Sequence, residues 1–120
     1  MNKRVTGSQY EDIACSFLTD SGMRVIQRNY RIRTGEIDIV AMDGRTVVFV
    51  EVKYRGNSHA GTALEAVSAA KRKQIIRVAR YYLYSHHILE TVNVRFDCVG
   101  IDGHEVKYVR NAFDAEGSIS

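Results

Sequence analysis

The sequence predicts a mixed α/β fold in which helices flank a central sheet, and three observations carry this prediction. Apolar residues recur at helical spacing near the start of the chain and again after residue 62. Short apolar runs between these segments are separated by an Asp-Gly turn, and a further strand-like run follows the second helix. A chain of 120 residues, 45% hydrophobic and 26% charged, suits one globular domain.

The first helix is expected to open at Thr6-Gly7-Ser8 and to end near Gly22. Its apolar face holds Tyr10, Ile13, Ala14, Phe17 and Leu18. Val25 and Ile26 then begin a short strand. Residues Asn29 to Thr34 are polar and basic, which predicts a turn region there.

Two strands joined by a tight turn come next. Residues Glu36 to Met42 alternate between apolar and polar side chains, as a half-buried strand does. Asp43-Gly44 is a strong signal for a β-hairpin. Residues Thr46 to Tyr54 form the returning strand, and its run Val47 to Val50 is apolar on both faces, as in a central strand. Together with the strand at Val25, these segments can form an antiparallel meander.

The second half of the chain supplies a long helix and one or two strands. A loop is expected at Arg55 to Gly61, and helical periodicity then extends from Thr62 to Ser85. Asn93 to Ile101 is the next predicted strand, and Glu105 to Val109 is a candidate edge strand after a turn. The long helix can act as a crossover, so the strand after it would lie parallel to the central strand.

One domain is therefore expected over residues 1–110, with residues 111–120 as a flexible C-terminal tail. We expect no signal peptide and no membrane span, because no apolar run is long enough. Cys15 and Cys98 lie far apart in apolar stretches, which favours free thiols and a cytoplasmic protein. The net charge of +3 leans weakly toward a polyanionic partner.

The residues with chemical potential lie on the two strands of the hairpin. Glu51 and Lys53 point to one face of the returning strand, because side chains alternate. A symmetric register about the Asp43-Gly44 turn places Asp38 opposite residues 49 to 51. Two carboxylates about 5 Å apart repel by about 3 kcal/mol at an effective dielectric near 20. A hard cation such as Mg²⁺ or Mn²⁺ would relieve this repulsion.

Such a site would suit phosphodiester hydrolysis, which needs a metal ion, a water and a cation that faces the phosphate. Lys53 would stand beside the metal and stabilise phosphate charge or orient the attacking water. The alternative is a solvated salt-bridge cluster at the rim of the sheet, because a Glu-x-Lys motif arises often by chance. The position of Asp38 across a credible hairpin favours the metal site.

Further candidates lie on the two helices. Glu11, at the edge of the first apolar face, could turn toward Asp38, but Ser8-x-x-Glu11 also has the pattern of a capping box. Lys71 and Gln74 interrupt the apolar face of the second helix. They could reach substrate phosphate or simply extend their polar ends to solvent.

Several arginines and one further acid complete the set of candidates. Arg31 and Arg33 precede the first strand of the hairpin, and Arg55 follows Lys53. All three arginines are candidates for phosphate contacts. On the outer face of the second helix, the basic residues are more simply explained by solvation; these are Arg72, Lys73, Arg77 and Arg80. Asp97 is expected to be the structural partner of an arginine.

Several segments together resemble the YraN-like family of small bacterial proteins, and the resemblance extends to about Val109. They are Gly7 with Glu11, Arg28-Asn29-Tyr30-Arg31, Gly35-Glu36-Ile37-Asp38, Phe49-Val50-Glu51-Val52-Lys53-Tyr54-Arg55, Ala66-Val67, Lys71 and Arg95-Phe96-Asp97. That family is in turn similar to the PD-(D/E)xK nucleases, especially the archaeal Holliday junction resolvases. The resemblance implies a restriction-endonuclease-like αβββαβ core and a magnesium-dependent phosphodiesterase site.

The resemblance also implies roles for individual residues. Asp38 matches the first acid of the superfamily, and Glu51 and Lys53 match its Glu-x-Lys. Glu11 matches the glutamate of the first helix in resolvase-like members, which would make Asp38, Glu51 and Glu11 the metal ligands. The implied substrate contacts on the second helix are Lys71 and Gln74. Ile37 stands where the name of the superfamily has proline.

The leading functional hypothesis is a metal-dependent endonuclease that acts on DNA, including branched or otherwise structured DNA. The alternative is a nucleic-acid-binding accessory module without catalysis, and a third reading is a structural or interaction protein. Nucleic acid is the expected partner, DNA before RNA, although no base-stacking motif is apparent. A homodimer would suit a resolvase-type enzyme, since two cuts need two sites.

Overall fold

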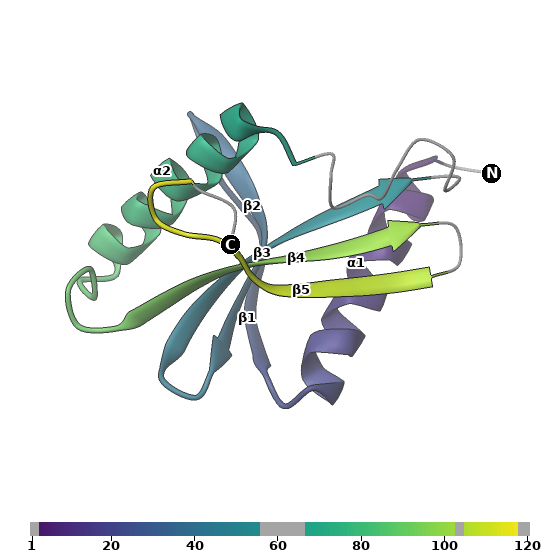
Figure 1. The fold of residues 1–120 in the computed structure, drawn as a ribbon, viewed down its shortest axis with the longest axis horizontal. Coiled ribbons are helices and arrows are strands. Elements are labelled where there is room, and N and C mark those ends of the chain that lie inside the picture. Colours follow the sequence, from purple (N-terminus) through teal and green to yellow (C-terminus); the bar gives the residue numbers. More distant parts are fainter. Residues whose placement is uncertain (1–2, 56–66, 103–104, 118–120) are drawn as a thin grey trace.

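The structure is a computed structural model that describes residues 3–55, 67–102 and 105–117. It confirms the predicted mixed α/β class, with helices on either side of a sheet (Figure 1). The elements in chain order are α1 (Lys3–Asp20), β1 (Arg24–Ile32), β2 (Gly35–Asp43), β3 (Thr46–Arg55), α2 (Ala69–Ser85), β4 (Asn93–Asp102) and β5 (Glu105–Phe113). This order contains the predicted αβββαβ core and adds one strand.

The five strands form one sheet in the order β1-β2-β3-β4-β5. β1, β2 and β3 make the predicted antiparallel meander, and β4 runs parallel to β3 after the α2 crossover. β5 returns antiparallel to β4. β3 is therefore the central strand, and its run Val47 to Val50 is buried, as the sequence predicted.

The two faces of the sheet carry separate apolar cores, one under each helix (Figure 1). The core under α2 includes Ile75 and Val78 of the helix together with Phe49 of β3. The core under α1 includes Ala14 and Leu18 together with Val50. Neighbouring residues of β3 thus face opposite cores, which is why this strand is apolar along its whole first half.

The predicted turn region at Asn29 to Thr34 is wrong, because β1 continues to Ile32. β1 is an edge strand that buries little, so its sequence lacks the apolar alternation of an internal strand. Its pairing with β2 is also irregular between Val25 and Gln27, and Asn29 adopts a positive φ of 54°. Irregular pairing shifts the alternation of inward and outward side chains, so the sequence of such a strand lacks the regular period of two that predicts a strand.

Both helices begin at positions other than those predicted. α1 starts at Lys3, so Ser8 lies inside the helix and the capping-box explanation of Glu11 is wrong. α2 starts at Ala69, where the Ser68 side chain accepts a hydrogen bond from the backbone N–H of Lys71. Residues 62–66 of the predicted helix, and residues 56–61 of the predicted loop, lie outside the described residues.

The last strand extends past the predicted end of the domain at residue 110. β5 runs to Phe113, and Ala112 and Phe113 are buried in the core under α2. Beyond it the chain turns back to α2, where Arg72 Nε donates a hydrogen bond to the carbonyl oxygen of Gly117 at 2.8 Å (Figure 1). Residues 118–120 of the predicted tail lie outside the described residues.

In the described part of the chain, neither helix combines the length and the apolar character that crossing a bilayer requires.

Candidate metal and phosphate site

The β2–β3 hairpin brings the two predicted acids together. The strands pair in regular register from Asp43↔Thr46 to Ile39↔Val50, and continuing that register places Asp38 opposite Glu51. Backbone pairing stops there, and the N–H of Val52 instead donates to Asp38 Oδ2 at 2.8 Å. The Asp38 carboxylate thus takes the place of a ladder acceptor at the point where the two strands separate.

Glu51 is buried, with only 4% of its surface exposed. Its Oε2 lies 4.0 Å from Lys53 Nζ and 3.9 Å from Lys71 Nζ, while its buried Oε1 has no hydrogen-bond partner among the described residues. Burial, followed by the negative charge of Asp38, raises the pKa of Glu51 to about 8. The positive charges of Lys71 and Lys53 act in the opposite direction but do not offset these two effects.

Opposing effects also act on the pKa of Asp38. Burial raises its pKa, and the hydrogen bond from the Val52 N–H and the hydrogen bond with the Glu51 side chain oppose that shift. The nearby charges of Glu11 and Glu36 raise the pKa further. Two neighbouring acids with raised pKa values are an environment that favours either a retained proton or a bound cation.

Lys71 lies near Glu51, and Gln74 contacts Lys71 rather than either acid. Lys71 Nζ donates a hydrogen bond to Gln74 Oε1 at 3.1 Å while it approaches Glu51. Gln74 packs against the first residue of β2, Gly35, where an added Cβ would lie 2.6 Å from Gln74 Cγ. Gly35 therefore leaves the room in which Gln74 supports Lys71.

Glu11 lies near the two acids but is held by other residues. Its Oε1 accepts hydrogen bonds from Asn29 Nδ2 at 3.0 Å and from Arg28 Nη2 at 3.4 Å. Its charge still raises the pKa of Asp38. Glu11 is thus on the predicted side of the site, in an ion pair that a metal ion would have to displace or share.

Two of the three predicted arginines, Arg31 and Arg33, form no ion pair with Asp38 or Glu51. Arg31 forms an exposed ion pair with Glu36 at 3.4 Å, and Arg33 is exposed in the turn between β1 and β2. Arg55 ends β3, and its side chain lies outside the described residues. Phosphate contacts by these three residues stay a prediction.

The residues present fit a magnesium ion better than a metal that needs many protein ligands. No set of three or more His, Cys, Asp or Glu side chains converges within the described ranges 3–55, 67–102 and 105–117. Mg²⁺ commonly binds through one or two carboxylates and keeps several waters. Asp38 and Glu51 provide that pair, and the orphaned Oε1 of Glu51 is an oxygen ligand without another use.

An aromatic pair that the sequence pattern did not predict lies on the α1 face of β3. The rings of Tyr10 and Tyr54 stack with centroids 3.9 Å apart and an interplanar angle of 18°. Tyr10 precedes Glu11 on α1, and Tyr54 follows Lys53 on β3. Their places next to predicted site residues were the only available signal, because their contact depends on how α1 packs on the sheet.

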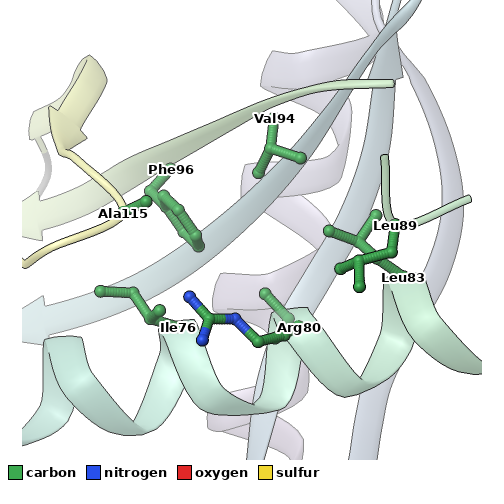
Figure 2. Close-up of a pocket in the computed structure, with 8 residues that line it drawn as sticks. Ile76, Arg80, Leu83, Leu89, Val94, Phe96 and Ala115 are labelled. Carbon is green, nitrogen blue, oxygen red and sulfur yellow. The ribbon is translucent and has the colours of Figure 1, made fainter. Parts of the chain in front are cut away.

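An apolar cavity of about 160 Å³ lies elsewhere, between α2, β4 and the segment after β5 (Figure 2). Its lining includes Ile76 and Leu83 of α2 and Phe96 of β4, and it contains none of the predicted site residues. The candidate site is therefore the pair Asp38 and Glu51, where β2 and β3 separate, and this cavity is not part of it.

Asp97 has the predicted structural role. It is fully buried, and Arg95 donates to both of its oxygens, with Nε 3.0 Å from Oδ1 and Nη2 3.1 Å from Oδ2. The hydroxyl of Tyr108 and the backbone N–H of Asn111 also donate to it. All of these partners belong to β4 and β5, which leaves Asp97 no part in the acidic site.

Known proteins resemble this chain over nearly its full length. The model of the uncharacterised protein family UPF0102 matches residues 10–101. A UPF0102 protein of Lachnoclostridium phytofermentans is 44% identical over 118 residues, which cover 98% of this chain and 100% of the relative. A UPF0102 protein of Prosthecochloris aestuarii is 47% identical and covers 92% of this chain and 94% of the relative. The chain thus belongs to the uncharacterised protein family UPF0102, the YraN-like family that its motifs resemble.

Proposed function

We propose that the protein is a Mg²⁺- or Mn²⁺-dependent endonuclease that hydrolyses phosphodiester bonds in DNA. One observation carries the proposal: half-buried Asp38 and buried Glu51 are neighbours where β2 and β3 separate, and Glu51 Oε1 has no partner among the described residues. An ionised carboxylate buried in this way is unfavourable unless it is paired or binds a metal. A divalent cation would offset that cost and would also bind a phosphate oxygen.

Each residue of the site has a role in this proposal. Asp38 and Glu51 would hold the cation, with the backbone carbonyl of Val52 as a candidate further ligand. The bound cation supplies Lewis-acid activation of the phosphate and of an attacking water. Lys53, beside Glu51, would stabilise charge on the phosphate oxygens or orient the water. Lys71, supported by Gln74, adds a second positive charge on the same side.

The proposal also covers the type of nucleic acid, the location in the cell and the oligomeric state. We expect DNA before RNA, with branched or structured DNA among the substrates, and a cytoplasmic location for a chain with the free thiols Cys15 and Cys98. A homodimer would place two sites on one junction. The surface of α2 offers a candidate interface, because Tyr81 and Tyr84 are 49% and 67% exposed.

One observation favours a second candidate, a nucleic-acid-binding module without catalysis. Glu11 is engaged by Arg28 and Asn29, so the described acids of the site number two rather than the predicted three. A protein of this kind would bind DNA through its basic residues and would not turn it over. Binding without cleavage is the result that would favour it.

Metal binding is the first test. Calorimetric titration of Mg²⁺ and Mn²⁺ into the wild-type protein should show a site that Asp38→Asn and Glu51→Gln abolish or weaken by at least about tenfold. Asp20→Asn, which removes an exposed acid at the end of α1, is the matched control and should bind as the wild type does. Equal affinities in all four proteins would overturn the metal site.

Cleavage is the second test. A panel of linear duplex, single-stranded, flapped and four-way junction DNAs should be cut in Mn²⁺ by the wild type and the Asp20→Asn control. Asp38→Asn and Lys53→Met should lose that activity by at least about a hundredfold, because each removes a group proposed to act on the phosphate. Activity that survives in both variants would come from a contaminant and would refute the proposal.

A further inference from the structure

An exposed aromatic pair lies on the α1 face of β3, the strand that also carries Glu51 on its α2 face. Tyr54 leaves β3 on the side of α1, and its ring stacks on Tyr10 at 3.9 Å with an interplanar angle of 18°. Stacking covers one face of the Tyr54 ring, yet the residue remains 43% exposed. A large aromatic side chain that is held flat by a neighbour and still meets solvent has a surface available to a second flat ring.

The position of this pair relates it to the phosphate-binding groups. Tyr54 lies one residue beyond Lys53 and three beyond Glu51, which is about 10 Å along an extended strand. Tyr10 lies one residue before Glu11 on α1. Tyr54 projects toward α1, whereas Glu51 projects toward α2. A nucleotide chain with a phosphate at Asp38 and Glu51 would therefore have to pass around the end of β3 to bring a base one or more nucleotides away to Tyr54.

We propose that Tyr54, supported from behind by Tyr10, is a stacking platform for an unpaired nucleobase of a strand whose phosphate is held at the acidic site. The inference rests on the proposed function and deepens it by naming the substrate class. Aromatic side chains bind single-stranded nucleic acids by stacking on bases, and such contacts tolerate any sequence because every base has a flat face. Tyr10 restrains the Tyr54 ring, so binding a base requires little further ordering.

This platform selects DNA that has unpaired bases. In a continuous duplex each base is already stacked on its neighbours, whereas a flap, a gap or a frayed junction arm has a free base. Charge also favours this ligand over an apolar peptide, because Lys53 and Lys71 lie beside the site and the chain has a net charge of +3.

The chain contains no tryptophan, so a single substitution gives a unique fluorescent reporter. Tyr54→Trp keeps a flat ring at the platform, and Tyr84→Trp places the same reporter at a 67% exposed position on α2. Each variant is titrated in EDTA with oligothymidylate and with an abasic oligonucleotide of equal length. The abasic strand keeps the phosphates and removes the bases.

We expect oligothymidylate to quench the Tyr54→Trp emission while the abasic strand does not, and Tyr84→Trp should respond to neither. Absence of quenching at Tyr54→Trp, equal quenching by the two strands, or equal quenching at both reporters would each overturn the platform. Because EDTA removes divalent cations, the outcome does not depend on metal binding or on cleavage.

A second pair of variants measures affinity without the reporter. Tyr54→Leu should raise the Kd for oligothymidylate by about 5- to 100-fold, the usual effect of losing one stacked base, while Tyr54→Phe should stay within about twofold of wild type. Circular dichroism checks that both variants fold. Equal Kd values for Tyr54→Leu and wild type would contradict the proposal.

The two proposals fail in different ways. Quenching and an affinity loss without any cleavage would retain the platform and refute the nuclease. Cleavage of flapped DNA with the same KM in Tyr54→Leu as in wild type would retain the nuclease and refute the platform.

Discussion

At Glu51 the burial of the side chain strongly disfavours the charge of its carboxylate. Only 4% of its surface is exposed, and burial and the charge of Asp38 together raise its pKa from 4.5 to about 8. Lys53 and Lys71, at 4.0 and 3.9 Å, are too distant for strong hydrogen bonds and only reduce the shift. Without a cation the folded protein therefore holds a proton on this acid near neutral pH.

This raised pKa predicts a pH-dependent stability in the metal-free protein. Protonated Glu51 favours the folded state, so its contribution is complete below pH 4.5 and is lost as the pH rises through about 8. Glu51→Gln removes the titration, because glutamine stays neutral. The free energy of unfolding of this variant, relative to wild type, should rise by on the order of 3 kcal/mol between pH 5 and pH 8.5.

Urea unfolding in EDTA at the two pH values measures this difference. Glu90→Gln, which changes an exposed glutamate, should track the wild type at both. Parallel pH curves for Glu51→Gln and wild type would show that Glu51 titrates as it does in the unfolded chain.

At the scale of elements, the site depends on contact between α2 and the start of β2. A Cβ added to Gly35 would lie 2.6 Å from Gln74 Cγ of α2. The same Gln74 side chain accepts the hydrogen bond from Lys71. A glycine at the first position of β2 thus determines how closely the helix approaches and where the Lys71 ammonium lies. Neither residue would have this effect without the other.

This contact predicts a measurable coupling. Gly35→Ala should lower the free energy of unfolding by about 1–2 kcal/mol, because the new Cβ lies 2.6 Å from Gln74 Cγ and the side chain must move. The φ of 157° at Gly35 adds backbone strain that does not depend on Gln74. In a Gln74→Ala background the same substitution should cost at least about 0.5 kcal/mol less. Urea denaturation of the four proteins gives the coupling energy.

The matched control replaces Gln27, an exposed glutamine on β1. In a Gln27→Ala background, the cost of Gly35→Ala should be unchanged. A cost that is the same in all backgrounds would mean that Gly35 and Gln74 do not constrain each other.

The elements show where pattern-based prediction succeeds and fails. The β2–β3 hairpin was predictable because Asp43-Gly44 meets a specific backbone need, and Gly44 adopts the positive φ of 62° that such turns require. The full length of β1 was not, because an edge strand with a bulge need not alternate. The start of α2 also differed, since Val67 is buried before the helix begins and continues an apolar period without being helical.

At the scale of the whole molecule, a second charged network joins three strands and includes neither Asp38 nor Glu51. Arg95 is 10% exposed and binds Asp97 on its own strand and Asp43 at the end of β2, the latter at 2.8 Å. Tyr108 of β5 donates to Asp97 as well. In contrast to Glu51, both Asp97 oxygens have partners, so this network is satisfied without a metal ion.

Removing the buried acid should therefore destabilise the fold. Asp97→Ala would leave Arg95 with Asp43 as its remaining carboxylate partner among the described residues, and the expected loss is about 3–5 kcal/mol in the free energy of unfolding. Thermal or urea unfolding measures this loss, and the exposed Asp20→Ala should change stability by less than about 0.5 kcal/mol. A small effect of Asp97→Ala would show that the network contributes little to stability.

The sequence alone determined the fold class, the hairpin and the pairing of Asp38 with Glu51, because each depends on local periodicity or on counting residues from one turn. Only the tertiary structure decided what surrounds those acids. The ion pair of Glu11 with Arg28, the approach of Lys71 and the stacking of Tyr10 on Tyr54 all join segments far apart in the chain. Such contacts depend on how each helix packs against its face of the sheet, and no single stretch of sequence encodes that packing.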